Sequence, residues 1–347
     1  MTALRGGRGG ASHDLADWLQ EKLRPLIELS EELEALGVHY EGHSWSIVKL
    51  LILGGWSYVY TTIIPHYFKE YWYVDLLAGS GTVRVKETGD IVLGSPFVAH
   101  FFARQPFTKY FLVELNRERY NALHARATRV IGPPDRVRVL PYDCNKYIPR
   151  LIRSVERGTH FLAFVDNEGL DVYWSTIECL LGADCDILIN FPTTGVRRVL
   201  GAAREGDESQ AEALTRFFGG DLWREAAGEE ELLEIYLQQL ASRYRELRGK
   251  GAYVSSIRVG SRRFYYDIIL ICKCGPYVRA WEYLKEKLEW RDPNIVRYTL
   301  DLLKGRTQRI DWLVGLHDEI ERAEREERRR KRREEGRYLP LDKFFAH

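Results

Sequence analysis

The sequence lacks the features that define several classes of protein. It has five cysteines among 347 residues, too few and too scattered for a disulfide framework. Cys272 and Cys274 form one C-x-C pair with no second pair, so we expect no metal site. No apolar run approaches the roughly 18 residues that cross a membrane, and the Gly/Arg-rich start is unlike a secretory signal. We therefore expect a cytoplasmic protein with no membrane partner.

An excess of charge of one sign is also lacking. The 51 Lys and Arg residues balance 50 Asp and Glu residues, and the formal net charge is +1. This balance excludes a uniformly basic surface for nucleic acid, so any such surface is local. Arginine outnumbers lysine by 38 to 13 and methionine occurs once, which favours a thermophile as the source, although a GC-rich genome would also favour arginine.

Five short apolar segments alternate with helix-like segments in the middle of the chain. The predicted strands are 71–76, 109–114, 137–140, 161–166 and 186–191. Because parallel strands need crossover helices, this alternation predicts a doubly wound parallel sheet. Segments 252–259 and 263–272 meet at a Gly-Ser turn and predict an antiparallel hairpin. A parallel core that ends in such a hairpin is typical of the α/β, Rossmann-like class I methyltransferase fold with seven strands.

Composition and chain breaks divide the sequence into six segments. Helical spacing before the first strand predicts N-terminal helices, one of them over 46–64. The segments are a flexible arm (1–12), an N-terminal helical segment (13–68), the cofactor-binding half of the sheet (69–192), a helical insertion (193–250), the terminal hairpin with helices (251–304), and a long charged helix with an aromatic tail (305–347).

A glycine-containing loop follows the first predicted strand, where residues 75–81 read DLLAGSG. Gly79 and Gly81 allow the backbone to turn tightly at the carboxyl end of a strand, where open α/β sheets bind ligands. The three-glycine dinucleotide pattern is absent, which favours a cofactor without pyrophosphate, such as S-adenosyl-L-methionine. Ser95, before Pro96, is expected to cap a helix beside this loop.

Acidic residues end the strands that follow. Glu114 is placed to accept the ribose hydroxyls, and Asp143 to accept the adenine amino group. The alternative, in which each acid only caps a helix, stays open. The predicted cofactor-binding residues are Asp75, Leu77, Ala78, Gly79, Ser80, Gly81, Ser95, Glu114, Leu115, Asp143 and Cys144.

These motifs, in this order, resemble the three-Cys-motif partner protein (TcmP) family over residues 46–200. The shared set is DLLAGSG, Gly94-Ser95-Pro96, VELN, Asp143-Cys144-Asn145, FVDNEG with Trp174, and INFPTTGVRR. The resemblance implies a class I methyltransferase-like fold, in a family whose substrates are poorly defined. Two features depart from the family: its D-P-F-G loop reads DNEG at 166–169, and the basic tail lies outside the shared block.

Polar residues after the fourth and fifth strands predict where a methyl acceptor binds. Transfer to an exocyclic amine such as cytosine N4 needs carboxylate and carbonyl oxygens that disperse the positive charge developing on nitrogen. The ring of Phe191 would hold a flipped base, unless it packs in the core. The predicted catalytic residues are Asp166, Asn167, Glu168, Asn190, Phe191 and Pro192.

Local arginine clusters favour RNA as the substrate. Two arginines follow the fifth strand and three flank aromatic residues of the hairpin, a mixture suited to phosphates and stacked bases. The alternatives are that these arginines pair with acids, and that the basic run 328–333 is a solvated helix. The predicted substrate-binding residues are Arg197, Arg198, Arg258, Arg262 and Arg263.

The sequence thus predicts an S-adenosylmethionine-dependent methyltransferase that acts on rRNA or tRNA. One alternative is a non-catalytic methyltransferase-like partner protein in DNA repair or in a radical-enzyme complex. Residues 338–345 resemble a sliding-clamp-binding peptide, with Tyr338 in place of the usual leading glutamine. A further alternative function is that of a small-molecule methyltransferase with residues 193–250 as its lid.

Overall fold

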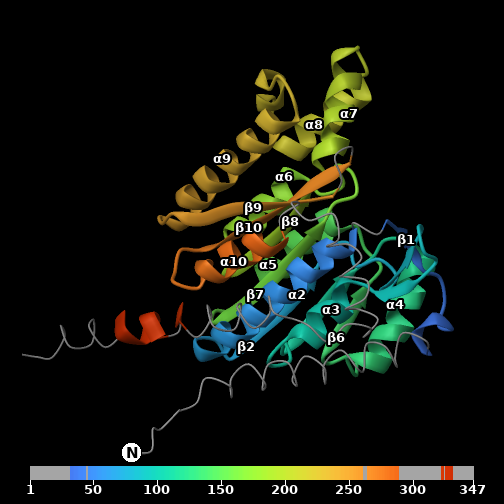
Figure 1. Cartoon of the computed structure of the whole chain (residues 1–347), viewed down its shortest axis with the longest axis vertical. Coiled ribbons are helices and arrows are strands. Elements are labelled where there is room, and N and C mark those ends of the chain that lie inside the picture. The colour runs from blue at the N-terminus through green and yellow to red at the C-terminus, as the bar shows by residue number, and fades with distance from the viewer. Residues whose placement is uncertain (1–31, 44–45, 261–263, 289–321, 324, 331–347) are drawn as a thin grey trace, which may run out of the picture.

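The computed structural model of the chain describes residues 32–43, 46–260, 264–288, 322–323 and 325–330 (Figure 1). Several predicted features lie outside these residues. They are the arm 1–12, residues 13–31 of the predicted N-terminal helical segment, Arg262 and Arg263, and the tail 338–345.

Seven strands form the central sheet in the order β6-β5-β2-β7-β8-β10-β9. The first five strands in this order are parallel, whereas β10 pairs antiparallel with β8, and β9 with β10. This arrangement confirms the predicted Rossmann-like class I methyltransferase fold. The strands are β2 (Glu70–Asp75), β5 (Lys109–Val113), β6 (Val137–Leu140), β7 (Thr159–Asp166), β8 (Cys185–Phe191), β9 (Ala252–Gly260) and β10 (Tyr265–Lys273).

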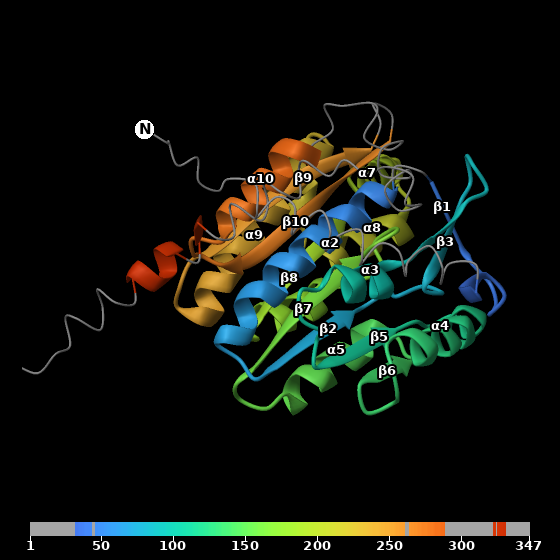
Figure 2. The same ribbon diagram turned by 60° about the horizontal axis from the view of Figure 1, so that its bottom comes forward.

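Helices cover both faces of this sheet and produce two separate cores (Figure 2). Alternate residues of a strand point to opposite faces, so Tyr71 and Tyr73 of β2 enter one core while Trp72 and Val74 enter the other. The first core is closed by α2 (Ser46–Ile63), α3 (Ser95–Phe102), α4 (Arg117–Val130) and α10 (Val278–Leu288). The second is closed by α5 (Cys144–Ser154), α6 (Trp174–Leu181), α7 (Thr193–Arg204), α8 (Glu208–Phe218) and α9 (Glu229–Arg248).

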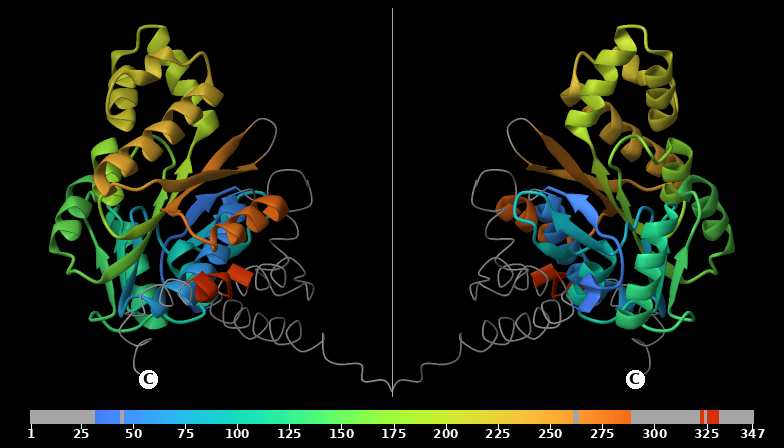
Figure 3. Two further views of the ribbon diagram at one scale, coloured as in Figure 1. Left: turned by 90° about the vertical axis from the view of Figure 1, so that its left-hand side faces the viewer. Right: turned by 90° about the vertical axis from the view of Figure 1, so that its right-hand side faces the viewer.

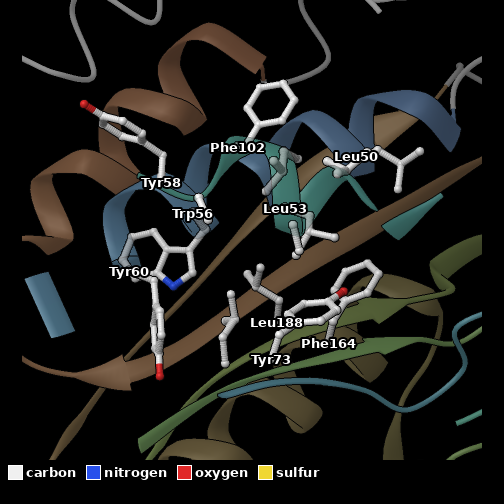
Figure 4. Close-up of a cluster of buried hydrophobic side chains, with 14 of the residues drawn as sticks. Leu50, Leu53, Trp56, Tyr58, Tyr60, Tyr73, Phe102, Phe164 and Leu188 are labelled. Carbon is white, nitrogen blue, oxygen red and sulfur yellow. The ribbon is translucent and has the colours of Figure 1, made fainter. Parts of the chain in front are cut away.

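Helix α2 lies across the sheet with Leu53 and Trp56 facing sheet residues such as Tyr73 and Phe164 (Figure 4). By length and composition the segment Ile47–His66 is apolar enough to cross a membrane, which corrects the expectation that no run is that long. However, 89% of its apolar window is buried inside the protein. Packing on the sheet therefore accounts for the composition of α2.

The helices α7, α8 and α9, with the short 3-10 helix η2 (Leu222–Glu225), lie between β8 and β9 in the sequence and gather at one end of the molecule (Figure 3). Their aromatic residues surround Phe191, which is fully buried against Phe217 and Tyr236. The prediction that Phe191 holds a flipped base is therefore wrong. Its ring belongs to the second core, as its place in a strand covered on both faces requires.

The sequence also missed a small second sheet. It consists of β1 (Tyr40–Gly42), β3 (Thr82–Val85) and β4 (Ile91–Leu93), with β3 in the middle. Strand β1 pairs with a partner more than 40 residues away, which local patterning does not reveal. This sheet places an N-terminal segment beside the loop that follows β2.

One buried carboxyl group gives the fold a measurable pH dependence. Asp186 in β8 is 3% exposed and accepts a hydrogen bond from Trp56 Nε1 at 3.3 Å. Burial raises the pKa of Asp186 to about 7 from its ordinary value of 3.8. The folded state therefore holds this proton more tightly than the unfolded state. The resulting stabilisation is complete below pH 3.8 and is lost as the pH rises through about 7.

We expect Asp186→Asn to remove this dependence, because the amide does not ionise. Between pH 5 and pH 8, the free energy of unfolding of the wild type should fall by about 1–3 kcal/mol relative to that of the variant. Urea denaturation at the two pH values measures this difference. Asp135→Asn, at an exposed aspartate, is the matched control and should follow the wild type. If the free energy of unfolding changes equally with pH in Asp186→Asn and in the wild type, the pH dependence does not come from Asp186.

Candidate active site

A pocket opens at the carboxyl end of the parallel strands, between the loop after β2 and an N-terminal segment. We call residues 77–81 the glycine loop and residues 33–43 the N-terminal strap. The pocket holds about 510 Å³ of space not filled by atoms, its open mouth included. It is lined by Tyr40, Gly42, Ile47, Lys49, Leu50, Leu77, Ala78, Gly79, Ser80, Gly81, Thr82, Val83, Gly94, Ser95, Asp166 and Glu168.

The glycine loop has a conformation that requires its glycines. Gly79 and Gly81 have φ values of 62° and 81°, in the left-handed region. A Cβ atom on Gly81 would lie 2.6 Å from the ring of Phe97, whereas one on Gly79 would meet no atom within 4 Å. The loop is anchored to the neighbouring strand because the Ala78 amide donates to the Val113 carbonyl at 2.8 Å. Because Gly79 has no side chain, the pocket wall has open space at this position, which we call the open cradle at Gly79.

Asp75 lies beneath this loop rather than in the pocket. Its Oδ2 atom accepts hydrogen bonds from Ser95 Oγ at 2.6 Å and Tyr73 Oη at 2.8 Å. Burial raises the pKa of Asp75 to about 7, although these two hydrogen bonds oppose the shift. The expectation that Ser95 caps α3 is wrong, since Gly94 holds the N-cap position and the Ser95 hydroxyl bonds Asp75 instead.

Glu114 and Asp143 end β5 and β6 at the same edge of the sheet, beyond the lined pocket. Glu114 Oε1 accepts from the Asn116 amide at 2.7 Å and lies 3.5 Å from Arg119 Nε. Asp143 Oδ1 accepts from the Asn145 amide at 2.9 Å, so it caps α5. Asp143 thus makes the helix cap that the alternative expects, whereas α4 is capped by Asn116 and not by Glu114. Both acids lie at the edge where ligands bind.

The other two predicted cofactor residues at this edge differ in exposure. The Leu115 side chain is 67% exposed, which is unusual for leucine and leaves an apolar surface beside Glu114. Cys144 is buried, and burial raises the pKa of its thiol to about 12. The Cys144 thiol therefore stays protonated and is not a nucleophile.

An ion pair that the sequence did not reveal lies at the end of β7. Lys49 Nζ, from α2, lies 2.7 Å from Asp166 Oδ2 and 2.9 Å from Asp166 Oδ1. Burial disfavours the charge on Lys49, but the Asp166 carboxylate outweighs it and raises the pKa of the ammonium. One signal was available, because Lys49 is the single charged residue of an otherwise apolar helix.

Two asparagines support this ion pair from behind the pocket wall. Asn190 Nδ2 donates to Asp166 Oδ1 and to the Asn167 carbonyl, each at 2.9 Å. Asn167 and Asn190 are buried, and neither lines the pocket. Pro192, also buried, lies at the start of α7. These three predicted residues therefore do not contact the pocket directly.

Glu168 is the second carboxylate of the pocket. Burial raises its pKa, and a hydrogen bond with the Tyr40 side chain opposes that shift. Tyr40 belongs to the N-terminal strap, which the sequence did not assign to the site. The loop after β7 is thus held at two points, by Tyr40 on Glu168 and by Lys49 on Asp166.

The strap is joined to the glycine loop by a buried guanidinium. Arg126 of α4 is fully buried and donates to the carbonyls of Gly37 at 3.0 Å, Val38 at 2.8 Å and Ser80 at 2.8 Å. Its Nε also donates to the Leu33 carbonyl at 3.0 Å. Burial lowers the pKa of Arg126 to about 10, which still leaves it charged at neutral pH.

Two of the five predicted substrate-binding arginines pair with acidic residues of the protein. Arg258 pairs with Glu230 at 2.7 Å and with Asp267 at 3.1 Å, and Arg197 pairs with Glu229 at 3.0 Å. For these two arginines the structure shows the alternative, pairing with acids. Arg198 is exposed on α7. In the described ranges, no group of three or more His, Cys, Asp or Glu side chains is arranged to hold a metal ion.

No family model matches the sequence, and no curated protein matches it. The resemblance to the TcmP family therefore stays a prediction. Among solved structures, the DUF519 protein LPL1258 from Legionella pneumophila is 15% identical, with a TM-score of 0.42, over 76% of this chain and 94% of its own. Trm1 from Pyrococcus horikoshii, solved with S-adenosyl-L-methionine, is 12% identical, with a TM-score of 0.36, over 66% of this chain and 55% of its own. These likenesses concern the fold alone.

We expect Arg126→Lys to loosen the N-terminal strap, because a lysine has no planar fork to satisfy four carbonyl groups. The free energy of unfolding should fall by about 2–4 kcal/mol. Amide hydrogen exchange should also speed up over residues 33–43. Arg129→Lys, on the exposed face of the same helix, is the matched control and should stay within about 0.5 kcal/mol of the wild type. Unchanged exchange in the strap of Arg126→Lys would contradict this role.

Proposed function

We propose that the chain is an S-adenosylmethionine-dependent methyltransferase. The observation that carries the proposal is the open cradle at Gly79, at the carboxyl end of β2 and beside the acid that ends β5. Ligands of doubly wound sheets bind at this edge. A loop with this glycine spacing lacks the pattern for a pyrophosphate, so it favours a cofactor without phosphate groups.

The residues present fit such a cofactor. The backbone of the glycine loop would hold its amino-acid part, Glu114 its ribose hydroxyls and Asp143 its adenine amino group. The exposed Leu115 side chain offers an apolar contact for the base. Because Lys49 neutralises Asp166, the Glu168 carboxylate is the pocket group that favours a cationic ligand. When bound, the cofactor supplies an electrophilic methyl group on a sulfonium.

The residues of the chain orient the reactants and limit access of water. The N-terminal strap forms one wall of the pocket and is held by Arg126. Asp75 joins the glycine loop to α3, because its carboxylate accepts from the Leu77 amide at 3.4 Å and from Ser95 Oγ at 2.6 Å. Such fixed positions are what a transfer reaction requires, since the two reacting atoms must be held in line.

We further propose RNA, such as rRNA or tRNA, as the substrate. The support is local: Arg198 is exposed on α7, the helix that follows β8, and residues 328–330 are all arginine. The pairing of Arg197 and Arg258 with acids reduces the basic surface that the sequence predicted. An exocyclic base amine such as cytosine N4 is the acceptor that the sequence predicts. To contact Asp166, that amine would have to displace Lys49 from its ion pair.

Two glycines provide a matched test of the cofactor site. Gly79 and Gly89 both have left-handed φ values, and a Cβ on either would meet no atom within 4 Å, but only Gly79 lines the pocket. Both Gly→Ala variants should lose about 1–2 kcal/mol of stability from backbone strain. Titration calorimetry with S-adenosylhomocysteine should show at least about tenfold weaker binding for Gly79→Ala and about unchanged binding for Gly89→Ala.

A second variant tests the ribose contact, since Glu114→Ala removes the carboxylate expected to hold two hydroxyl groups. Its affinity for S-adenosylhomocysteine should also fall by about tenfold or more. If the wild type binds neither S-adenosylmethionine nor S-adenosylhomocysteine, the proposed function is wrong. That result would favour the non-catalytic partner protein.

A further inference from the structure

Lys49 and Asp166 line the part of the pocket where the methyl acceptor would bind. The group available to a ligand there is the Lys49 ammonium rather than a free carboxylate. Oδ1 of Asp166 already accepts hydrogen bonds from Lys49 and Asn190, and Oδ2 lies 2.7 Å from Lys49 Nζ in the ion pair. The side chains of Lys49 and Asp166 are 12% and 16% exposed, so each reaches the pocket but is largely shielded from water. A ligand in this part of the pocket therefore contacts the Lys49–Asp166 ion pair.

The ammonium has a donor left for a ligand. A lysine carries three N–H groups, and Nζ donates one hydrogen bond, to Asp166 Oδ1. No other described residue accepts a hydrogen bond from Lys49 Nζ. A remaining N–H therefore suits an atom with an available lone pair that bears negative charge.

This arrangement distinguishes two kinds of methyl acceptor. A neutral amine becomes positively charged as it takes a methyl cation, and an ammonium beside it raises the energy of that transition state. A hydroxyl oxygen gains negative character as its proton leaves, and the same ammonium stabilises that charge. The lysine thus opposes transfer to nitrogen and assists transfer to oxygen.

We propose that Lys49 contacts the acceptor atom and selects a hydroxyl oxygen, which in RNA is the ribose 2′-hydroxyl. The proposal rests on the methyltransferase function proposed above and names the acceptor of the same site. It assigns Lys49 a catalytic role that the sequence did not suggest.

The step balances with groups that line the pocket. The hydroxyl proton passes to the Glu168 carboxylate, and an oxygen lone pair forms the new O–C bond. The C–S bond breaks with its electron pair on sulfur, which leaves a neutral thioether and a neutral methyl ether. Desolvation raises the pKa of Glu168, which makes this carboxylate a better proton acceptor than one with an ordinary pKa.

The methylated atom can be identified directly. RNA from a strain that lacks the gene is incubated with the protein and S-adenosylmethionine carrying a deuterated methyl group, then digested to nucleosides for mass spectrometry. We expect the label to stay with the ribose fragment. Label on a base nitrogen overturns this inference and leaves the methyltransferase function standing. No label in any nucleoside overturns the RNA substrate and this inference together.

Substitutions of Lys49 separate a catalytic role from a structural one. Lys49→Met should lower kcat by about 100-fold or more, while the Kd for S-adenosylhomocysteine stays within about threefold. Its Tm should also fall, because the substitution leaves the Asp166 charge unpaired. The double variant Lys49→Met/Asp166→Asn should recover Tm without recovering kcat. Recovery of kcat in the double variant, or near-normal kcat in Lys49→Met, would overturn the proposal.

Lys86→Met is the matched control. Lys86 is exposed at the end of β3 and lies outside the pocket lining, so the same loss of a lysine charge should leave kcat and Tm about unchanged. An equal loss of kcat in Lys86→Met would show that net charge, rather than the Lys49 ammonium, sets the rate.

Discussion

The pocket depends on a guanidinium that is solvated by backbone carbonyl groups. Arg126 is fully buried, and no carboxylate in the described part of the chain forms an ion pair with it. Its hydrogen bonds end on carbonyls of the N-terminal strap and of the glycine loop. Since an unsolvated buried charge costs several kcal/mol, the strap and the loop are held together as two walls of one pocket. Helix α4 does not line the pocket, but through Arg126 it holds these two walls in place.

Three carboxylates near the pocket have different roles because their surroundings differ. Asp75 is enclosed below the glycine loop, where Tyr73 and Ser95 satisfy it, so it supports the loop. The Lys49 ammonium neutralises Asp166, and this ion pair lies at the carboxyl end of β7. Glu168 faces the pocket with a raised pKa. Burial and partners, rather than residue type, thus separate a structural acid from a paired one and from a candidate base.

The sheet and the glycine loop could be predicted from the sequence because both are local patterns. Short apolar strands separated by helices imply parallel order, and a glycine pair after a strand implies a turn at its carboxyl end. Lys49 and the strap could not be predicted in the same way, since strand β1 pairs across more than 40 residues and Lys49 contacts Asp166 across 117 residues. Phe191 was misread because a strand covered on both faces shows no alternation to mark its buried side. Asp143 fits a helix cap and a ligand contact equally well in sequence.

The central claim is that the strap, the glycine loop and the end of β5 form one cofactor site. Hydrogen–deuterium exchange with and without saturating S-adenosylhomocysteine tests it most directly, because it reports each segment separately. The account predicts slower exchange over residues 77–81, 114–116 and 37–42, with the helices between β8 and β9 unchanged. Unchanged exchange in the glycine loop, or slower exchange confined to residues 193–248, would contradict it.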